Sequence, residues 1–182
     1  PLLPVLNGIK TVLYPSPLHY RIIPELIYEH GVSILFSTNT FLMGYARNAN
    51  PYDFYSIRYI FAGAESLKES TRKLYMDKFG VRIYEGYGVT ETTPVAAVNT
   101  AMHYKAGTVG RVLPAMQTKL KAVPGIEQGG VLQLKGPNVM LGYIKHAQPG
   151  ILQAADEWYD TGDIVDIDQQ GFIKILEDYQ KF

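Results

Sequence analysis

The sequence predicts an α/β fold: a parallel sheet with helices on both faces, followed by a small antiparallel β-barrel-like subdomain. In the first hundred residues, short apolar runs alternate with segments whose apolar residues recur at three and four positions, which is typical of βαβ units. Beyond about residue 100 the helical period disappears, and short alternating runs lie between frequent glycines and prolines, as in half-buried antiparallel strands. We therefore expect an α/β subdomain in residues 1–100 and a β subdomain in residues 101–176.

The composition excludes several classes of protein. The 182 residues are 47% hydrophobic, which is too apolar for a disordered segment. Lysine plus arginine and aspartate plus glutamate both number 17, so there is no basic excess for binding nucleic acid. The absence of cysteine excludes a disulfide scaffold, a thiolate zinc site and a cysteine nucleophile. No apolar run approaches the roughly 18 residues of a transmembrane helix, and the missing initial methionine suggests a start inside a longer polypeptide.

Four strands and three helices are expected in the first half. The strands are the apolar runs at residues 11–14, 32–36, 57–61 and 81–85. The helices are residues 21–30, ended by Gly31; residues 40–48; and a third helix that a Ser66–Glu69 capping box begins and Gly80 ends. The buried stripe of the third helix is predicted from the apolar spacing of four residues: Leu67, Leu74, Tyr75 and Phe79.

The second half is predicted to contain antiparallel strands alone. Residues 118–123 and 131–135 alternate in polarity, and residues 164–167 and 172–176 flank a good hairpin turn at 168–171. Both a twisted barrel and an open sheet fit this pattern.

Two glycine-containing loops leave the carboxyl ends of predicted strands, where ligands bind in open α/β sheets. One loop is Gly63, Ala64 and Glu65; the other is residues 86–91, of sequence Gly-Tyr-Gly-Val-Thr-Glu. Glycine lets the backbone approach a ligand, Tyr87 offers a flat face for stacking, and Glu91 offers a hard oxygen for Mg²⁺. A glycine-rich crossover without a ligand explains the second loop equally well. It is not a dinucleotide fingerprint, since Glu91 stands where the third glycine should be.

A third cluster, residues 158–163, places two carboxylates around a Thr-Gly turn. Asp160 and Asp163 could accept hydrogen bonds from vicinal hydroxyls. Taken alone, the cluster is explained better as an aspartate-rich turn in which a side chain bonds to its own backbone.

Together, residues 62–65, 84–91 and 159–163 resemble the adenylate-forming superfamily, which includes acyl-CoA synthetases, luciferases and peptide-synthetase adenylation domains. Residues 107–110 and 136–143 match the same pattern, so the resemblance covers nearly the whole chain. It implies a fragment of the large N-terminal domain of such an enzyme, with ATP and Mg²⁺ as cofactors. By this resemblance Gly63, Ala64, Glu65, Gly86, Tyr87 and Gly88 line the adenine site, Tyr87 stacks on adenine, Thr90 contacts the α-phosphate, Glu91 holds Mg²⁺ and Asp163 binds the ribose.

Within the superfamily, residues 14–20 and 49–55 are most similar to the synthetase half of bifunctional acyl-[acyl-carrier-protein] synthetase / 2-acylglycerophosphoethanolamine acyltransferases. That branch implies a ligase on the cytoplasmic side that loads a fatty acid onto acyl carrier protein, with association of the full-length protein with the inner membrane left open. A separate acyltransferase domain would act on a lyso-phospholipid. Residues 32–44 are expected to wall the acyl site, although Phe36, Phe41 and Met43 fit the core equally well.

The sequence also departs from the superfamily pattern. The phosphate loop with its lysine and the lid with its catalytic lysine are absent from these residues, so the fragment alone is expected to be inactive. Residues 177–182 should begin the hinge to the lid, but Glu177 and Asp178 stand where Gly-Arg-x-x-Lys is expected. The alternatives are a fatty acyl-CoA ligase and a non-catalytic adenylate-binding module.

Overall fold

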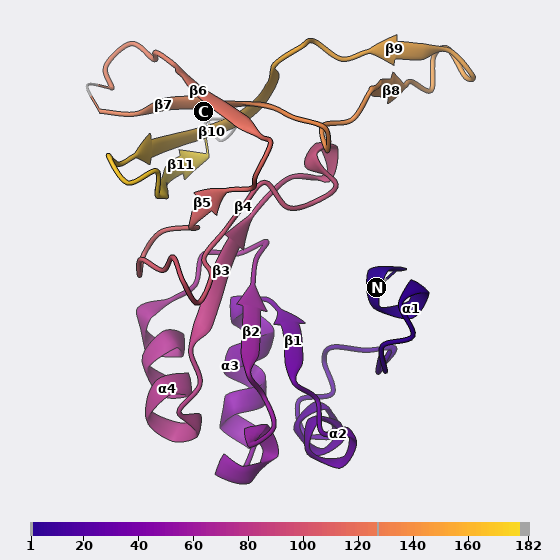
Figure 1. Ribbon diagram of the computed structural model, residues 1–182, viewed down its shortest axis with the longest axis vertical. Coiled ribbons are helices and arrows are strands. Elements are labelled where there is room, and N and C mark those ends of the chain that lie inside the picture. The colour runs from indigo at the N-terminus through magenta and orange to yellow at the C-terminus, as the bar shows by residue number, and fades with distance from the viewer. Residues whose placement is uncertain (1, 127, 179–182) are drawn as a thin grey trace. The chain divides into compact units, whose positions relative to one another are not determined.

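The computed structural model describes residues 2–126 and 128–178, with backbone alone for residues 177 and 178. The contacts within the chain divide it after Ile83 into two compact units. Figure 1 colours the elements in chain order. The predicted boundary at residue 100 concerns subdomains and stays a prediction. In the hinge segment, the backbone of residues 177 and 178 continues the last strand, and residues 179–182 lie outside the described residues.

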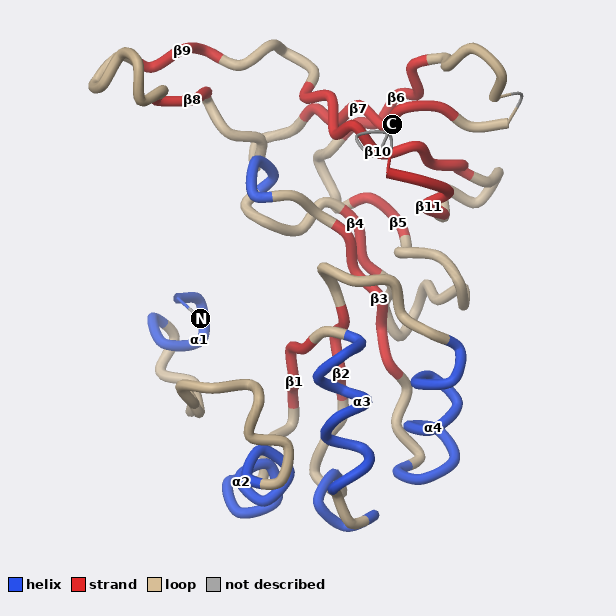
Figure 2. Tube along the Cα trace, turned by 180° about the vertical axis from the view of Figure 1, so that it is seen from behind, coloured by secondary structure: helices blue, strands red, loops and turns tan. Residues whose placement is uncertain are grey.

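The first unit is a parallel strand pair with helices against it. Strand β1 (Ile34–Ser37) pairs in parallel with β2 (Tyr59–Ala62), with Ile34 opposite Tyr59. Helix α3 (Asn39–Asn48) lies against one face of the pair, between α2 (Ile22–His30) and α4 (Glu69–Phe79), as Figure 2 shows. The remaining elements are α1 (Leu2–Leu6) and the 3₁₀ turn η1 (Pro51–Phe54). The predicted βαβ arrangement of these segments is confirmed.

The core of this unit lies between the strands and the helices. Leu42, Phe54, Ile60 and Tyr75 are essentially inaccessible to solvent. The ring of Tyr75 meets that of Phe54 edge-on at 5.6 Å, and its hydroxyl donates a 2.9 Å hydrogen bond to the carbonyl of Leu42. This bond lets a phenol sit in the core without an unsatisfied polar atom. The buried stripe predicted for α4 is confirmed for Leu74, Tyr75 and Phe79; Leu67 packs against the same cluster but precedes the helix.

The strand predicted at residues 11–14 is wrong. These residues have no regular structure, and Leu13 is 74% exposed. An apolar run becomes a strand only where a neighbour supplies backbone partners, and no ladder among the described residues includes this segment.

The capping box predicted for α4 is also wrong, because the helix begins at Glu69 and its N-cap is Lys68. Ser66 therefore lies outside the first turn. The cap comes from a distant residue: the Oδ1 atom of Asn39 accepts from the Lys68 amide (3.0 Å) and from the Thr71 hydroxyl (2.8 Å). The predicted helix ends are confirmed, since Gly31 and Gly80 adopt left-handed φ values of 59° and 67°.

The second unit is built from antiparallel strands. Strand β3 (Ile83–Tyr87) pairs with β4 (Ala97–Val98), which pairs with β5 (Arg111–Val112), and the 3₁₀ turn η2 (Thr90–Thr92) lies in the β3–β4 connection. A four-stranded sheet has the order β11-β10-β7-β6, and β8 (Gly142–Ile144) pairs with β9 (Leu152–Ala154). The bounds of the four strands are β6 (Gln117–Lys121), β7 (Gly130–Lys135), β10 (Tyr159–Ile167) and β11 (Ile173–Asp178).

The described sheets are open, and they form no closed barrel. The pairing of β6 with β7, and the hairpin of β10 and β11, confirm the strands predicted in this half. In the hairpin turn, Oδ1 of Asp168 accepts from the amides of Gln170 (2.8 Å) and Phe172 (2.9 Å), and Gly171 has a φ of 81°. The core contains Leu132, Leu134, Val165 and Ile173. Among the described residues, no helix is long and apolar enough to cross a bilayer.

Candidate adenylate site

Thr90 and Glu91 lie in a tight return of the chain between β3 and β4. The chain turns through η2 and through Thr93, whose φ of 57° is left-handed, and Ala96 then donates its amide to the carbonyl of Tyr87 at 2.8 Å. Thr92 is buried, and its hydroxyl oxygen accepts from the Val89 amide at 3.2 Å. The hydroxyl of Thr90 is exposed and makes no hydrogen bond to the described residues. The return therefore presents Thr90 to solvent from a rigidly bonded loop.

Gly88 is required by this return. A Cβ atom at position 88 would lie 1.6 Å from the carbonyl oxygen of Pro94, whereas at Gly86 the nearest atom would be 3.5 Å away. The backbone at Gly88 therefore approaches the chain itself closely, and the expected approach to a ligand stays a prediction.

The loop and the third cluster meet at one side-chain contact. The hydroxyl of Tyr87 donates to Oδ2 of Asp163 at 2.5 Å, although the two residues are 76 positions apart. Burial raises the pKa of Tyr87, and the bond to Asp163 raises it further. Two of the three dispersed motifs are thus brought together.

An irregularity in β10 directs Asp163 toward this contact. The register with β7 shifts between Asp160 and Ile164, and Gly162 in the shifted segment has a φ of 75°. The buried hydroxyl of Thr161 anchors it by donating to the carbonyl of Leu132 at 2.8 Å. Asp160 instead accepts the amide of Gly162 at 3.1 Å, which is the turn bond expected of an ordinary aspartate-rich turn. The two aspartates therefore have different surroundings.

Glu91 is held by a tyrosine that the sequence analysis did not assign. The hydroxyl of Tyr143, on β8, donates to Oε1 of Glu91 at 2.8 Å. The pKa of Tyr143 is raised chiefly by this bond, and the pKa of Tyr159 is raised chiefly by burial and then by Tyr143 and Glu91. Both tyrosines lie in motifs that carried the family resemblance. A sequence motif, however, does not show which distant residue each of its side chains contacts.

The surroundings of Glu91 suit a hard cation that shares its ligands with a phosphate. No lysine, arginine or histidine in the described part of the chain forms an ion pair with this carboxylate. The same residues contain no group of three or more side chains able to form a metal cage. Mg²⁺ is commonly held by one or two carboxylates, with phosphate oxygens and water completing its octahedron. The carboxylate of Glu91 has the chemistry for such a site, and its role as the metal ligand stays a prediction.

The turn at residues 63–65 belongs to the first unit. Its Ala64 has a left-handed φ of 64°, and Oε2 of Glu65 accepts from the amide (3.0 Å) and hydroxyl (2.7 Å) of Thr40. The Thr40 hydroxyl is the main cause of the lowered pKa of Glu65. Glu65 thus closes the N-terminal turn of α3, a role that the sequence analysis missed. The relation of this turn to the residues of the second unit stays a prediction.

The expected acyl-site residues divide between surface and core. Phe36 is 76% exposed and stacks on Phe61 at 5.6 Å, on the face of the strand pair away from Ile60. Phe41 packs against the buried cluster of the first unit. The core interpretation thus fits Phe41 and does not fit Phe36.

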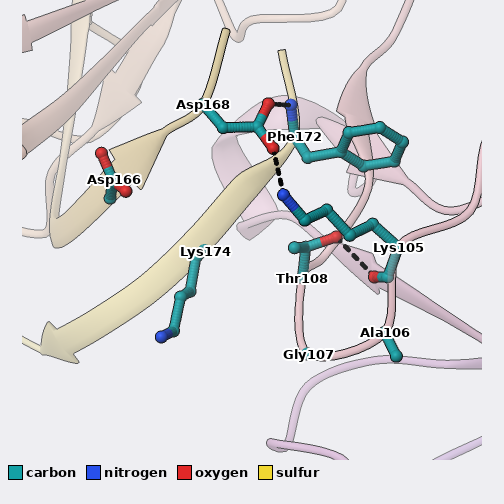
Figure 3. A pocket seen from close by; sticks show the side chains of 8 residues that line it. All are labelled: Lys105, Ala106, Gly107, Thr108, Asp166, Asp168, Phe172 and Lys174. Carbon is teal, nitrogen blue, oxygen red and sulfur yellow. Dashed lines mark hydrogen bonds and ion pairs between the residues drawn. The ribbon is translucent and has the colours of Figure 1, made fainter. Parts of the chain in front are cut away.

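A separate pocket of about 320 Å³ lies beside the β10–β11 turn (Figure 3). Two hydrogen bonds lie in its lining: Nζ of Lys105 donates to Asp168 at 2.6 Å, and the hydroxyl of Thr108 donates to the carbonyl of Lys105 at 2.8 Å. These bonds tie the 105–110 loop to the hairpin. The pocket is accordingly explained as a structural junction.

The chain belongs to the AMP-binding enzyme family, whose model matches residues 1–144. It is 30% identical over 186 residues to a probable 4-coumarate–CoA ligase of Dictyostelium discoideum, covering 97% of this chain and 34% of that protein. It is 29% identical over 182 residues to a long-chain-fatty-acid–CoA ligase of Salmonella typhimurium, covering 93% and 32%. The chain therefore spans about a third of the length of these relatives.

Solved structures show the same fold. The O-succinylbenzoate coenzyme A synthetase of Bacillus subtilis, in complex with ATP and magnesium ion, matches with a TM-score of 0.77 at 25% identity, over 98% of this chain and 38% of that one. A benzoate CoA ligase from Burkholderia xenovorans matches with a TM-score of 0.81 at 22% identity, over 97% and 37%. The predicted α/β architecture is therefore confirmed as that of the N-terminal domain of adenylate-forming enzymes.

Proposed function

We propose that this chain forms the adenylate-binding part of an ATP-dependent acid–thiol ligase. The observation that carries the proposal is the bond between Tyr87 and Asp163, because it joins an aromatic ring suited to a purine and a carboxylate suited to ribose hydroxyls. Thr90 and Glu91 follow Tyr87 in the same loop. A phosphate beyond the ribose would therefore have a hydroxyl and a metal carboxylate nearby in the chain.

The residues would act by binding and positioning. Tyr87 would stack on adenine, Asp163 would accept from the ribose hydroxyls, and the exposed hydroxyl of Thr90 would donate to the α-phosphate. Glu91 would hold Mg²⁺, which when bound neutralises charge on the phosphate oxygens. On the family resemblance alone, we also propose Gly63, Ala64 and Glu65 as residues that line the adenine.

The chemistry has two steps. A carboxylate oxygen of the acid attacks the α-phosphorus of ATP, the bond from that phosphorus to the bridging oxygen breaks, and pyrophosphate leaves. A thiolate sulfur then attacks the acyl carbon of the mixed anhydride, and AMP leaves. An acid with a pKa near 4 is already ionised at neutral pH, so the first step needs no general base. Alignment and charge stabilisation supply the rate, which is consistent with a site built from binding residues.

We propose a fatty acid as the acid substrate. The resemblance of residues 14–20 and 49–55 supports a fatty acid, and so does the long-chain-fatty-acid–CoA ligase among the relatives. Each buried CH₂ group contributes about 0.8 kcal/mol, so an apolar acyl site would discriminate by chain length. The relatives that are 4-coumarate and p-hydroxybenzoic acid ligases make an aromatic acid the competing substrate.

The acceptor thiol has two candidates. The resemblance favours acyl carrier protein, with reacylation of a lyso-phospholipid by a separate acyltransferase domain, and the names of the relatives favour coenzyme A. A non-catalytic adenylate-binding module is the candidate from another class.

These alternatives are separated by one set of assays on the protein as its gene encodes it. Adenylation should be followed as ATP–pyrophosphate exchange with acetate, octanoate, palmitate and 4-coumarate, and we expect kcat/KM for the long acids to exceed that for acetate by several orders of magnitude. Preference for coumarate or acetate would remove the fatty-acid assignment and leave the ligase assignment standing. Binding of ATP without exchange for any acid would favour the non-catalytic module. Thioester formation with each thiol would then identify the acceptor.

A further inference from the structure

We propose that residues 138–143 act as a brace that positions Glu91, with Tyr143 orienting its carboxylate and Asn138 fixing the backbone that follows it. This inference rests on the proposed function, in which Glu91 holds the metal ion. Asn138 and Tyr143 lie in the 136–143 motif, for which the sequence analysis gave no role. They are positioning residues, since they act through Glu91.

Hydrogen bonds of the backbone and of Asn138 join the brace to the loop after η2. The amide of Met140 donates to the carbonyl of Glu91 at 2.8 Å. The side-chain amide of Asn138 donates to the carbonyls of Thr92 (2.7 Å) and Val95 (3.1 Å), and its backbone carbonyl accepts from the hydroxyl of Thr93 at 2.7 Å. These bonds span 43 to 46 positions in sequence for Asn138, so they fix the loop from outside rather than within itself.

The side chain of Glu91 receives the remaining contact. Tyr143 donates to Oε1 at 2.8 Å, and Tyr159 lies close enough to both groups for their hydrogen bonding to help raise its pKa. A carboxylate oriented by a hydrogen bond has already lost rotational freedom, so less entropy is lost when it binds a cation. The brace would therefore strengthen metal binding without touching the substrate.

The test compares Tyr143→Phe, which removes only the hydroxyl, with Tyr52→Phe as a matched control. Tyr52 is 77% exposed and its hydroxyl has no hydrogen bond to the described residues. In the protein as its gene encodes it, Tyr143→Phe should raise the Mg²⁺ concentration for half-maximal pyrophosphate exchange by about three- to tenfold, the range expected for one hydrogen bond to a charged group. The maximal rate should change less than twofold, and Tyr52→Phe should match the wild type. An unchanged Mg²⁺ dependence in Tyr143→Phe would overturn the proposal.

A second readout needs neither nucleotide nor metal. Urea unfolding followed by the fluorescence of Trp158 should show a lower midpoint for Tyr143→Phe, and this loss should be clearly smaller when Glu91→Ala is already present, because that background lacks the bond between the two side chains. An equal loss in both backgrounds would overturn the brace. Near-normal pyrophosphate exchange by Glu91→Gln would instead remove the assignment of Glu91 as metal ligand. The urea comparison of the single and double variants would then be the sole test of whether Tyr143 positions Glu91.

Asn138→Ala offers an independent check on the backbone half of the brace. It should expose the loop at residues 92–95 to limited proteolysis at least several-fold faster than in the wild type. Cleavage at the wild-type rate would contradict the role given to Asn138.

Discussion

Tyr87 and Asp163 share a 2.5 Å hydrogen bond from the phenol to Oδ2, and it joins the end of β3 to the irregular segment of β10. Tyr87 is near the end of a strand, and Asp163 is aimed by the register shift around Gly162. The bond restrains both side chains before any ligand is present. This restraint suits the pair to the proposed nucleoside site, since binding then orders fewer groups.

Removing this bond should weaken nucleoside binding. Tyr87→Phe keeps the ring that would stack and removes only the hydroxyl, so we expect AMP affinity to fall by about three- to tenfold. Tyr87→Ala removes the ring as well and should cost about tenfold more. Calorimetric titration of AMP into each variant measures both losses. Equal affinity of Tyr87→Phe and wild type would show that the hydroxyl does not prepare Asp163.

The two glycines of the loop should respond differently to the same substitution. Gly88→Ala places a Cβ 1.6 Å from the Pro94 carbonyl oxygen, so the return must open; Gly86→Ala meets only ordinary contacts at 3.5 Å. We expect Gly88→Ala to destabilise the second unit by more than about 2 kcal/mol and to abolish AMP binding, and Gly86→Ala to retain it. Urea unfolding and AMP titration check the pair. Similar behaviour of the two variants would contradict the tight return.

The hydrogen bond from Thr161 to Leu132, which holds the irregular segment of β10, can be tested by measuring stability alone. Thr161→Val removes a buried hydroxyl and leaves the Leu132 carbonyl without its 2.8 Å partner, so the free energy of unfolding should fall by about 1–3 kcal/mol. Thr118→Val in the neighbouring β6 is the matched control, because the Thr118 hydroxyl makes no hydrogen bond to the described residues. A loss as large in Thr118→Val would mean that the anchor is unimportant.

Stability should decline in alkaline solution because two tyrosines, the buried Tyr75 and the partly buried Tyr87, resist ionisation. Burial raises the pKa of Tyr75 and of Tyr87, so their folded-state pKa values lie above the unfolded value near 10. Their contribution is fully present below about pH 10 and is lost as the pH rises toward the folded-state values. Unfolding free energies measured between pH 8 and pH 11.5 should fall, and the fall should be shallower in Tyr75→Phe. A flat profile in the wild type would contradict the raised pKa values of the two phenols.

The 182-residue chain by itself should not make acyl-adenylate. The family resemblance assigns the phosphate loop and the lid lysine to segments that these residues do not contain. Purified chain supplied with fatty acid, ATP and Mg²⁺ should release no pyrophosphate above the background rate. Release in proportion to the protein concentration would show that the proposed division of the active site is wrong.

The sequence by itself determined the periodic elements and the motifs. Helix α2, helix α3 and the β10–β11 hairpin follow from local spacing and from turn residues such as Asp168 and Gly171, because their stabilising bonds are formed between near neighbours. The three dispersed motifs were visible for the same reason. Residue type and spacing are properties of the chain alone.

Tertiary structure decided which of these features meet. The cap of α4 comes from Asn39 rather than Ser66, the run at residues 11–14 finds no partner strand among the described ladders, and Glu91 is held by Tyr143. The α4 cap and the contact to Glu91 each depend on a hydrogen bond between residues 29 or more positions apart, and residues 11–14 lack such a long-range partner among the described residues. Local propensity contributes only fractions of a kcal/mol per residue, so a distant donor or acceptor that completes a hydrogen bond decides the outcome.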